Sequence, residues 1–231
     1  MITLLLATRN AHKIKEIRAI LGQTYAYLSL QDFPNAPEVI EDAGTFAGKA
    51  TKKAIALAKW MQHRTRDTQS LYVLADDSGL EVDALHGAPG VHSARFATLD
   101  TGQSGNSSDA QNREKLLRLL QNVPPGCRTA RFRCVLALTP VPEPQQPSSS
   151  AVCDADELEL ATGLFEGTCE GQIGLAPKGQ GGFGYDPLFV PDGYAQTFAE
   201  LDAGVKNELS HRARALAKLK QRFVRSLTHL S

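Results

Sequence analysis

The sequence predicts an α/β protein, because apolar runs of strand length alternate along the chain with amphipathic helix patterns. Residues 2–7 form an apolar run that ends at a polar turn, and residues 71–75 form a second such run. A pattern of helical period follows the first run, with Ile14, Ile17 and Ile20 on one face. The chain has 231 residues, of which 42% are hydrophobic and 22% charged, a composition typical of folded globular proteins.

Apolar residues at helical spacing predict four helices, over residues 14–21, 46–61, 109–121 and 209–227. We expect Gly22 to end the first of them, since glycine commonly follows the last helical residue. Thr45 is placed to cap the amino terminus of the second helix, because its hydroxyl can accept from a first-turn amide.

Two further stretches, residues 129–139 and 164–173, alternate between apolar and polar side chains, and this period predicts strands. In the first of them, one face is expected to lie in solvent. Residues 140–158 include the run PVPEPQQPSSS, whose composition cannot pack a core. We therefore expect residues 140–158 to be a flexible loop insertion.

Charge and cysteine content argue against several classes of protein. The 25 Lys and Arg residues balance 25 Asp and Glu residues, which disfavours a nucleic-acid partner held through phosphate charge. Residues 2–7 are too short for a signal peptide and no later run approaches a membrane span, so we expect no membrane partner. The cysteines are scattered without metal-ligand spacing, at positions Cys127, Cys134, Cys153 and Cys169. Reduced thiols and a cytoplasmic location are therefore expected.

Two carboxylates, Asp76 and Asp77, follow the apolar run 71–75 directly and precede Ser78. Ligands gather at the carboxyl ends of strands in open α/β sheets, and adjacent carboxylates there suit Mg²⁺ or can deprotonate a water. The alternative is a structural one, in which an Asp-rich turn caps loop amides.

The turn from the first run into the first helix has the sequence TRNAHK, residues 8–13. Backbone N–H groups at such a turn, with Lys13 beside them, make a natural anion site. The alternative is a solvated basic helix face. Together with the acidic pair, this turn suggests a phosphate and a divalent ion.

A glycine-rich stretch carries Phe183 and Tyr185 on either side of Gly184, where a planar ring can lie against an aromatic face. The stretch matches the spacing of a dinucleotide-binding turn, but Pro187 prevents the helix which that motif requires. Further along, three donors at the entry of the last helix are able to meet oxygen acceptors on a base: Lys206, His211 and Arg212. The alternative is plain exposure, although cations at a helix start oppose its dipole.

These segments resemble the inosine triphosphate pyrophosphatase family. The matching stretches are LLATRNAHKIKE, EDAGTFAGKATKKA, LADDSGLEVDALHGAPGVHSARF, ARFRCVLAL, GQGGFGYDPLF and ELSHRARAL, in family order across nearly the whole chain. The resemblance implies one domain over residues 1–231, built as a mixed twisted sheet flanked by helices, with two lobes and the active cleft between them. It also implies a homodimer and Mg²⁺-dependent hydrolysis of XTP, ITP or dITP to the monophosphate and pyrophosphate.

The resemblance carries roles to individual positions. It implies that the triphosphate is bound by Thr8, Arg9, Asn10, Ala11, His12 and Lys13. It implies that the nucleoside is contacted by Ser78, Phe183, Gly184, Tyr185 and Asp186, and that its base is recognised by Lys206, His211 and Arg212. Asp77 is implied as magnesium ligand and proton acceptor. Glu41 is implied as the second metal carboxylate, with Glu38 and Asp42 as competitors.

Several alternatives stay open at the level of sequence. Many relatives carry Asn at the position of Lys49, whose side chain can either contact phosphate or point to solvent. The preferred substrate among XTP, ITP and dITP is not fixed, nor is the residue that excludes GTP. A related pyrophosphatase for pyrimidine or modified nucleotides, and a nucleotide sensor without catalysis, are the competing functions.

Overall fold

The structure is a computed structural model, and it describes residues 1–40, 42–65, 68, 70–100, 105–143 and 154–228, with no account of the side chains of 154–156 and 224–228. Its helices are α1 Ala11–Leu21, α2 Phe46–Gln62, α3 Asp109–Leu119, α4 Asp154–Ala161, α5 Ala203–Leu209 and α6 His211–Thr228. Its strands are β1 Thr3–Leu6, β2 Ala26–Ser29, β3 Leu71–Val82, β4 Thr129–Pro140, β5 Gly163–Ile173 and β6 Phe189–Pro191. The strand order is β2-β1-β3-β4-β5-β6. Because β1 pairs parallel with β2 and β3 while β5 pairs antiparallel with β6, the sheet is mixed, as expected.

The chain divides into two compact units. Unit 1 consists of Met1–Asp77, Val135–Glu166 and Ala215–Ser231, and unit 2 of Ser78–Cys134 and Gly167–Arg214. The strands β3, β4 and β5 and the helix α6 each contribute residues to both units.

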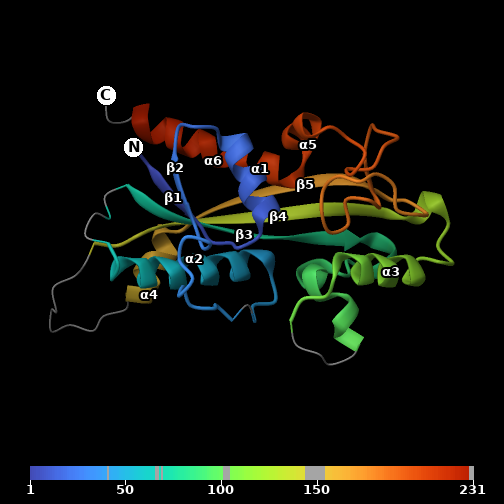
Figure 1. The fold of residues 1–231 in the computed structure, drawn as a ribbon, viewed down its shortest axis with the longest axis horizontal. Helices are drawn as coiled ribbons and strands as arrows, with labels where there is room; N and C mark the ends of the chain where they lie inside the picture. Colours follow the sequence, from blue (N-terminus) through green and yellow to red (C-terminus); the bar gives the residue numbers. More distant parts are fainter. Residues whose placement is uncertain (41, 66–67, 69, 101–104, 144–153, 229–231) are drawn as a thin grey trace. The chain divides into compact units, whose positions relative to one another are not determined.

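Unit 1 packs helices on both faces of its strands. Figure 1 shows α1 and the carboxyl-terminal part of α6 on one face, with α2 and α4 on the other. The ammonium of Lys220 on α6 donates to the carbonyl of Ile20 on α1, 2.5 Å away. The ring of Phe223 lies 5.5 Å from that of Tyr25 and 5.8 Å from that of Tyr72. These contacts fix α1, and with it the β1–α1 turn, against the strands.

Both predicted helix signals in unit 1 are confirmed. Gly22 follows the last residue of α1 with φ +77°, a conformation that glycine adopts without strain. The hydroxyl of Thr45 accepts from the amide of Gly48, 3.0 Å away, and so caps α2.

The prediction that a strand ends before the acidic pair is wrong. β3 continues through the pair to Val82, so the segment from Asp76 to Gly79 is extended strand and not a turn. The physical reason is that apolar burial resumes beyond the pair: Leu80 and Val82 are both fully buried. An Asp-rich capping turn is thereby excluded.

Two predicted boundaries also change. Leu209 ends α5 and does not belong to the last helix, because Ser210 is extended (φ −65°, ψ 158°) and its hydroxyl accepts from the amide of Ala213 at the start of α6. In the predicted insertion 140–158, the last five residues belong to α4, where Ala, Leu and Glu favour a helix that packs against α2. Residues 144–153 of the insertion lie outside the described residues.

Unit 2 surrounds an aromatic core. The ring of Phe132 on β4 lies 4.7 Å from Phe189 and 6.0 Å from Phe198. Leu116 on α3 is fully buried in the same cluster. This core supports α3 and the glycine-rich stretch.

Among the residues that the structure describes, no helix is long and apolar enough to cross a membrane. Cys127 is an exposed free thiol and Cys169 a buried one. Cys153 lies outside the described residues.

Candidate active site

The β1–α1 turn in unit 1 is shaped by Asn10. Its Oδ1 accepts from the amides of His12 (2.9 Å) and Lys13 (3.2 Å), and its own amide donates to the hydroxyl of Thr8 at 3.1 Å. Arg9, Asn10, Ala11 and His12 are exposed. The turn therefore presents its polar groups to solvent, although the Asn10 side chain already accepts from two first-turn amides.

Lys13 contacts the acidic pair directly. Its ammonium forms an ion pair with the carboxylate of Asp76 and donates to the backbone carbonyl of the same residue at 3.3 Å. The Asp76 side chain is only 1% exposed, whereas that of Lys13 is 17% exposed. Both residues stand out in the sequence, but no local pattern predicts that they pair. The bond places a cation beside the Asp76 carboxylate on β3.

Asp77 follows Asp76 on β3 and is half-buried, with its Oδ2 atom buried. Carboxylate oxygens are ligands that Mg²⁺ prefers, and magnesium sites commonly use one or two carboxylates together with substrate phosphates. Within the described part of the chain, no three His, Cys, Asp or Glu side chains gather as a metal site. As a carboxylate of this kind, Asp77 fits a magnesium ion that is completed by phosphate oxygens. Glu41 lies outside the described residues.

Lys49 lies on the buried face of α2 and is only 3% exposed. Of the two alternatives for this residue, a side chain that points to solvent is thereby excluded.

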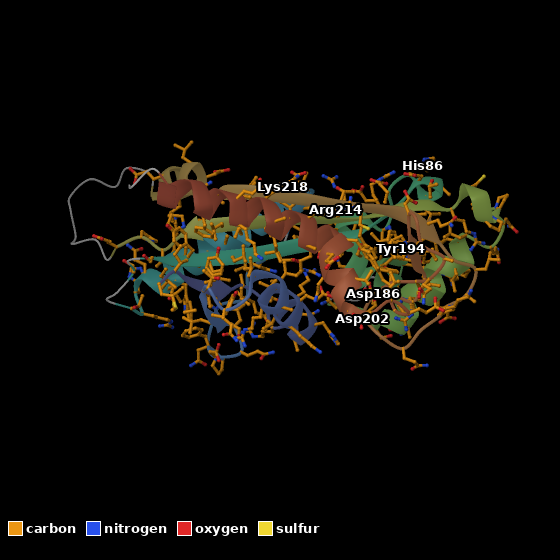
Figure 2. The ribbon with its side chains drawn as sticks, turned by 90° about the horizontal axis from the view of Figure 1, so that it is seen from above. His86, Asp186, Tyr194, Asp202, Arg214 and Lys218 are labelled. Atoms are coloured by element: carbon orange, nitrogen blue, oxygen red, sulfur yellow. The ribbon has the colours of Figure 1, made fainter. Side chains whose placement is uncertain are left out.

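In unit 2, Asp186 joins the glycine-rich stretch to α5. Its Oδ2 accepts from the ammonium of Lys206 at 2.6 Å and from the amide of Phe183 at 2.9 Å. Both members of this ion pair are buried, with side chains 4% and 8% exposed. Asp202 caps α5 by accepting from the amide of Gly204, and Figure 2 shows Asp186 near this end of the helix.

The half-buried ring of Phe183 has two cations near it. The ammonium of Lys206 lies 5.2 Å from the ring centroid, and the guanidinium carbon of Arg212 lies 5.9 Å from it. Arg212 is 1% exposed, and its Nη2 donates to the hydroxyl of Ser78 at 3.0 Å. A buried cation pair beside an aromatic ring offers hydrogen-bond donors and a stacking surface in one place.

His211 and Tyr185 are held deeper in unit 2. The imidazole of His211 stacks on Phe132, with centroids 4.8 Å apart and planes at 14°. The Tyr185 hydroxyl donates to the carbonyl of Ser93 at 2.9 Å. Burial, reinforced by the charge of Asp109, raises the pKa of Tyr185 well above its ordinary value. Phe183, not Tyr185, is therefore the aromatic face of the stretch that a ligand can reach.

Two residues at this stretch were missed by sequence reasoning. Asp109 Oδ2 accepts from the amide of Gly184 at 2.6 Å, and Arg113 Nη1 donates to the Gly184 carbonyl at 2.7 Å. They stand four positions apart at the start of α3, so they share one helix face. That spacing was the available signal, but nothing in the sequence showed which loop the face would meet.

The sequence-predicted residues thus form two sets. The phosphate-side set, in unit 1, comprises residues 8–13, Asp76 and Asp77. The base-side set, in unit 2, comprises Ser78, Phe183, Gly184, Tyr185, Asp186, Lys206, His211 and Arg212. Asp77 and Ser78, one from each set, are consecutive residues of β3.

Comparison with known families adds the decisive observation, because the model of the Ham1 family matches residues 4–222. The chain belongs to the Ham1 family. Among its relatives, a dITP/XTP pyrophosphatase of Desulforamulus reducens is 47% identical, over 98% of each chain. One of Shouchella clausii is 44% identical over 94% of each chain.

Solved Ham1 structures share the fold. A HAM1 protein of Coxiella burnetii is 33% identical with a TM-score of 0.74, covering 97% of this chain and 100% of its own. A nucleoside-triphosphatase/dITP/XTP pyrophosphatase of Mycobacterium abscessus is 36% identical with a TM-score of 0.62, covering 94% of this chain and 98% of its own. The mixed α/β architecture is therefore that of the family.

Proposed function

We propose that this protein hydrolyses non-standard purine nucleoside triphosphates (XTP, ITP and dITP) to the monophosphate and pyrophosphate. The relatives that carry the name dITP/XTP pyrophosphatase match it over nearly their whole length. The single structural observation that carries the proposal is the buried cation pair Lys206 and Arg212 beside the ring of Phe183. Such a site favours a planar ring with an acceptor oxygen.

The phosphate-side set would bind the triphosphate. Lys13 pairs with Asp76 on β3, and a phosphate oxygen that replaces Asp76 as its partner keeps the ammonium paired. The exposed β1–α1 turn supports the same role, since polar groups of Thr8, Arg9 and Asn10 stand at the start of a helix. Lys13 would offset the negative charge that gathers on the pyrophosphate as it leaves.

Asp77 would hold Mg²⁺ through a carboxylate oxygen, and Glu41 is the second carboxylate that we propose for the ion. When bound, the ion supplies positive charge to the phosphate oxygens during cleavage. Asp77 would orient the attacking water and accept its proton, because an ionised carboxylate oxygen accepts a hydrogen bond from water and can take its proton. Water attacks the α-phosphorus in this scheme, which releases pyrophosphate as one product.

Hydrogen-bond donors of the protein would recognise the base. Hypoxanthine and xanthine present an acceptor oxygen at position 6, where adenine presents an amino donor. Three donors would face this edge of the base: Lys206, His211 and Arg212. The adenine amino group would then have no acceptor, and polar sites strongly reject such a mismatch. The ring of Phe183 would stack on the base, and the hydroxyl of Ser78 would be held for the nucleoside by Arg212.

The cytoplasm is the proposed location, and the free thiols of Cys127 and Cys169 support a reducing compartment. The homodimer implied by the resemblance is proposed on that ground alone.

A nucleotide panel tests the function. Purified protein is assayed for pyrophosphate release from ITP, XTP, dITP, ATP, GTP, dUTP and dTTP, with Mg²⁺ and with excess chelator. We expect the three non-standard purines to be cleaved at least a hundredfold faster than ATP, and only with the ion. Preferential cleavage of dUTP or dTTP would favour a pyrimidine enzyme. Tight binding of ITP without turnover would favour a sensor.

A further inference from the structure

Gly184 is held on both sides by α3. Its amide donates to Asp109 and its carbonyl accepts from Arg113, at 2.6 and 2.7 Å. These contacts join parts of the chain 75 and 71 positions apart. Neither α3 residue belongs to the two sets that the proposed function uses.

The conformation of Gly184 explains why its backbone needs to be held. Its φ is +61°, and the position that a Cβ would occupy has no heavy atom within 4 Å. Side-chain packing therefore cannot fix this residue, and glycine rotates more freely than any other residue. The bonds from Asp109 and Arg113 fix the peptide groups on either side of it.

Neighbouring residues of the stretch have their own anchors. The Tyr185 hydroxyl reaches the carbonyl of Ser93, and Asp186 is paired with Lys206. Phe183 is tied to Asp186 twice: its amide donates to the Asp186 carboxylate, and its carbonyl accepts from the Asp186 amide at 3.2 Å. The same carbonyl belongs to the peptide group whose N–H donates to Asp109. The direction of the Phe183 ring thus depends in part on the peptide groups that α3 holds.

α3 itself does not depend on these two bonds. Ser108 and Gln111 form a complete capping box at its amino terminus. Its buried face carries Leu116, fully buried, and Lys115, whose ammonium donates to the carbonyl of Phe96 at 2.7 Å. Loss of the Gly184 contacts would therefore leave the helix in place.

We propose that Asp109 and Arg113 are positioning residues that fix the Phe183 ring in the direction needed to stack on the nucleobase. The inference rests on the proposed function, in which Phe183 contacts the base. It adds that substrate affinity is set in part by a helix that touches no substrate. Positioning of this kind strengthens binding of the base and leaves the rate of cleavage at the phosphates unchanged.

Steady-state kinetics on ITP test the proposal with four variants of α3 and with Phe183→Ala. Asp109→Ala and Arg113→Ala are each expected to raise KM about tenfold with kcat within about twofold, the loss typical of one hydrogen bond to a charged group. Asp109→Asn keeps an acceptor oxygen for the Gly184 amide and is expected to restore most of the affinity. Glu114→Ala, an exposed change on the same helix, is the matched control and is expected to leave both constants unchanged.

The outcomes separate this inference from the proposed function. Wild-type protein that does not cleave ITP overturns the proposed function and the inference with it. Wild-type cleavage, with KM raised by Phe183→Ala but not by the two alanine changes on α3, overturns the inference alone. Unchanged KM with a lower melting temperature, or an alanine variant that does not fold, also overturns it, since the bonds would then serve only to stabilise α3.

Discussion

The phosphate-side and base-side sets differ in how their charges are held. On the phosphate side, Lys13 is partly exposed and its carboxylate partner Asp76 is buried, so the cation can move to a new anion while the carboxylate stays. On the base side, Lys206 and Asp186 are both buried, and Arg212 is 1% exposed. Under the proposed roles, the base-side donors are fixed before substrate arrives, whereas the phosphate-side cation changes partners when it binds.

This contrast suits the two halves of the substrate. Every nucleoside triphosphate carries the same phosphates, so the phosphate side needs charge but not discrimination. Bases differ by single donors and acceptors, and a site that discriminates between them needs donors that cannot turn to fit the wrong one. Changes on the phosphate side should lower turnover of all nucleotides alike. Changes on the base side should alter which nucleotide is chosen.

The largest effect is expected for Asp77→Asn, which keeps the size of the side chain and removes the charge that holds the ion and accepts the proton. We expect kcat on ITP to fall about a thousandfold, with an unchanged circular dichroism spectrum. Asp83→Asn is the matched control, because Asp83 is a largely exposed carboxylate paired with Arg131 at 2.9 Å. Near-normal turnover by Asp77→Asn would remove Asp77 from the mechanism.

Lys13→Ala should have the next largest effect. We expect kcat/KM to fall about a hundredfold for ITP and by the same factor for residual ATP cleavage, since the lost ammonium serves phosphates common to both. Lys15→Ala, an exposed lysine on the same helix, should leave both unchanged. A loss confined to ITP would contradict the assignment of Lys13 to the phosphates.

Arg212→Ala should change the preference between nucleotides more than the overall rate of hydrolysis. The ratio of kcat/KM for ITP to that for ATP is expected to fall about tenfold, because a donor to the base is lost. Arg212 is buried, so Arg212→Lys is measured beside it, and thermal unfolding is recorded for both. Arg214→Ala controls for loss of a guanidinium on α6, since Arg214 is exposed and donates to the carbonyl of Thr168. Equal losses for ITP and ATP would mean that Arg212 does not recognise the base.

The smallest effect is expected for Tyr185→Phe, which should change how the free energy of unfolding depends on pH above pH 10. Burial raises the pKa of Tyr185, so the folded state favours the neutral phenol. Its contribution to the free energy of unfolding is complete below the tyrosine pKa of the unfolded chain, about 10, and is lost as pH rises toward the folded pKa. Tyr185→Phe should cost about 1 kcal/mol at pH 7, through the lost bond to Ser93, and should weaken the decline above pH 10. Urea unfolding at pH 7 and pH 10.5 measures both; an equally steep decline in the variant would contradict this account.

The sequence predicted the elements that depend on local signals. Gly22 and Thr45 mark helix ends through their own backbone and side-chain chemistry, so the end of α1 and the start of α2 were found. The course of β3 was not found, because an acidic pair normally marks exposure. Here Asp76 is buried against Lys13, a partner 63 positions away. A pairing between residues so far apart in the chain cannot be predicted from the hydrophobic pattern around either residue.

The candidate site divides in the same way. The sequence singled out Lys13 and Asp76, which the structure pairs in unit 1, and Phe183 and Arg212, which it brings within 5.9 Å of each other in unit 2. What the sequence could not predict is which donors face each other, such as Arg113 and the carbonyl of Gly184. Those contacts depend on how α3 packs within its unit. The residues of one segment do not determine which other segment they will contact.

The most direct test of the central claim is to follow the oxygen of the attacking water. ITP is hydrolysed by the wild-type protein in water enriched in oxygen-18, and the products are separated and weighed by mass spectrometry. The account predicts inosine monophosphate carrying one heavy oxygen and unlabelled pyrophosphate. Label in the pyrophosphate, or release of inosine diphosphate and inorganic phosphate, would contradict it.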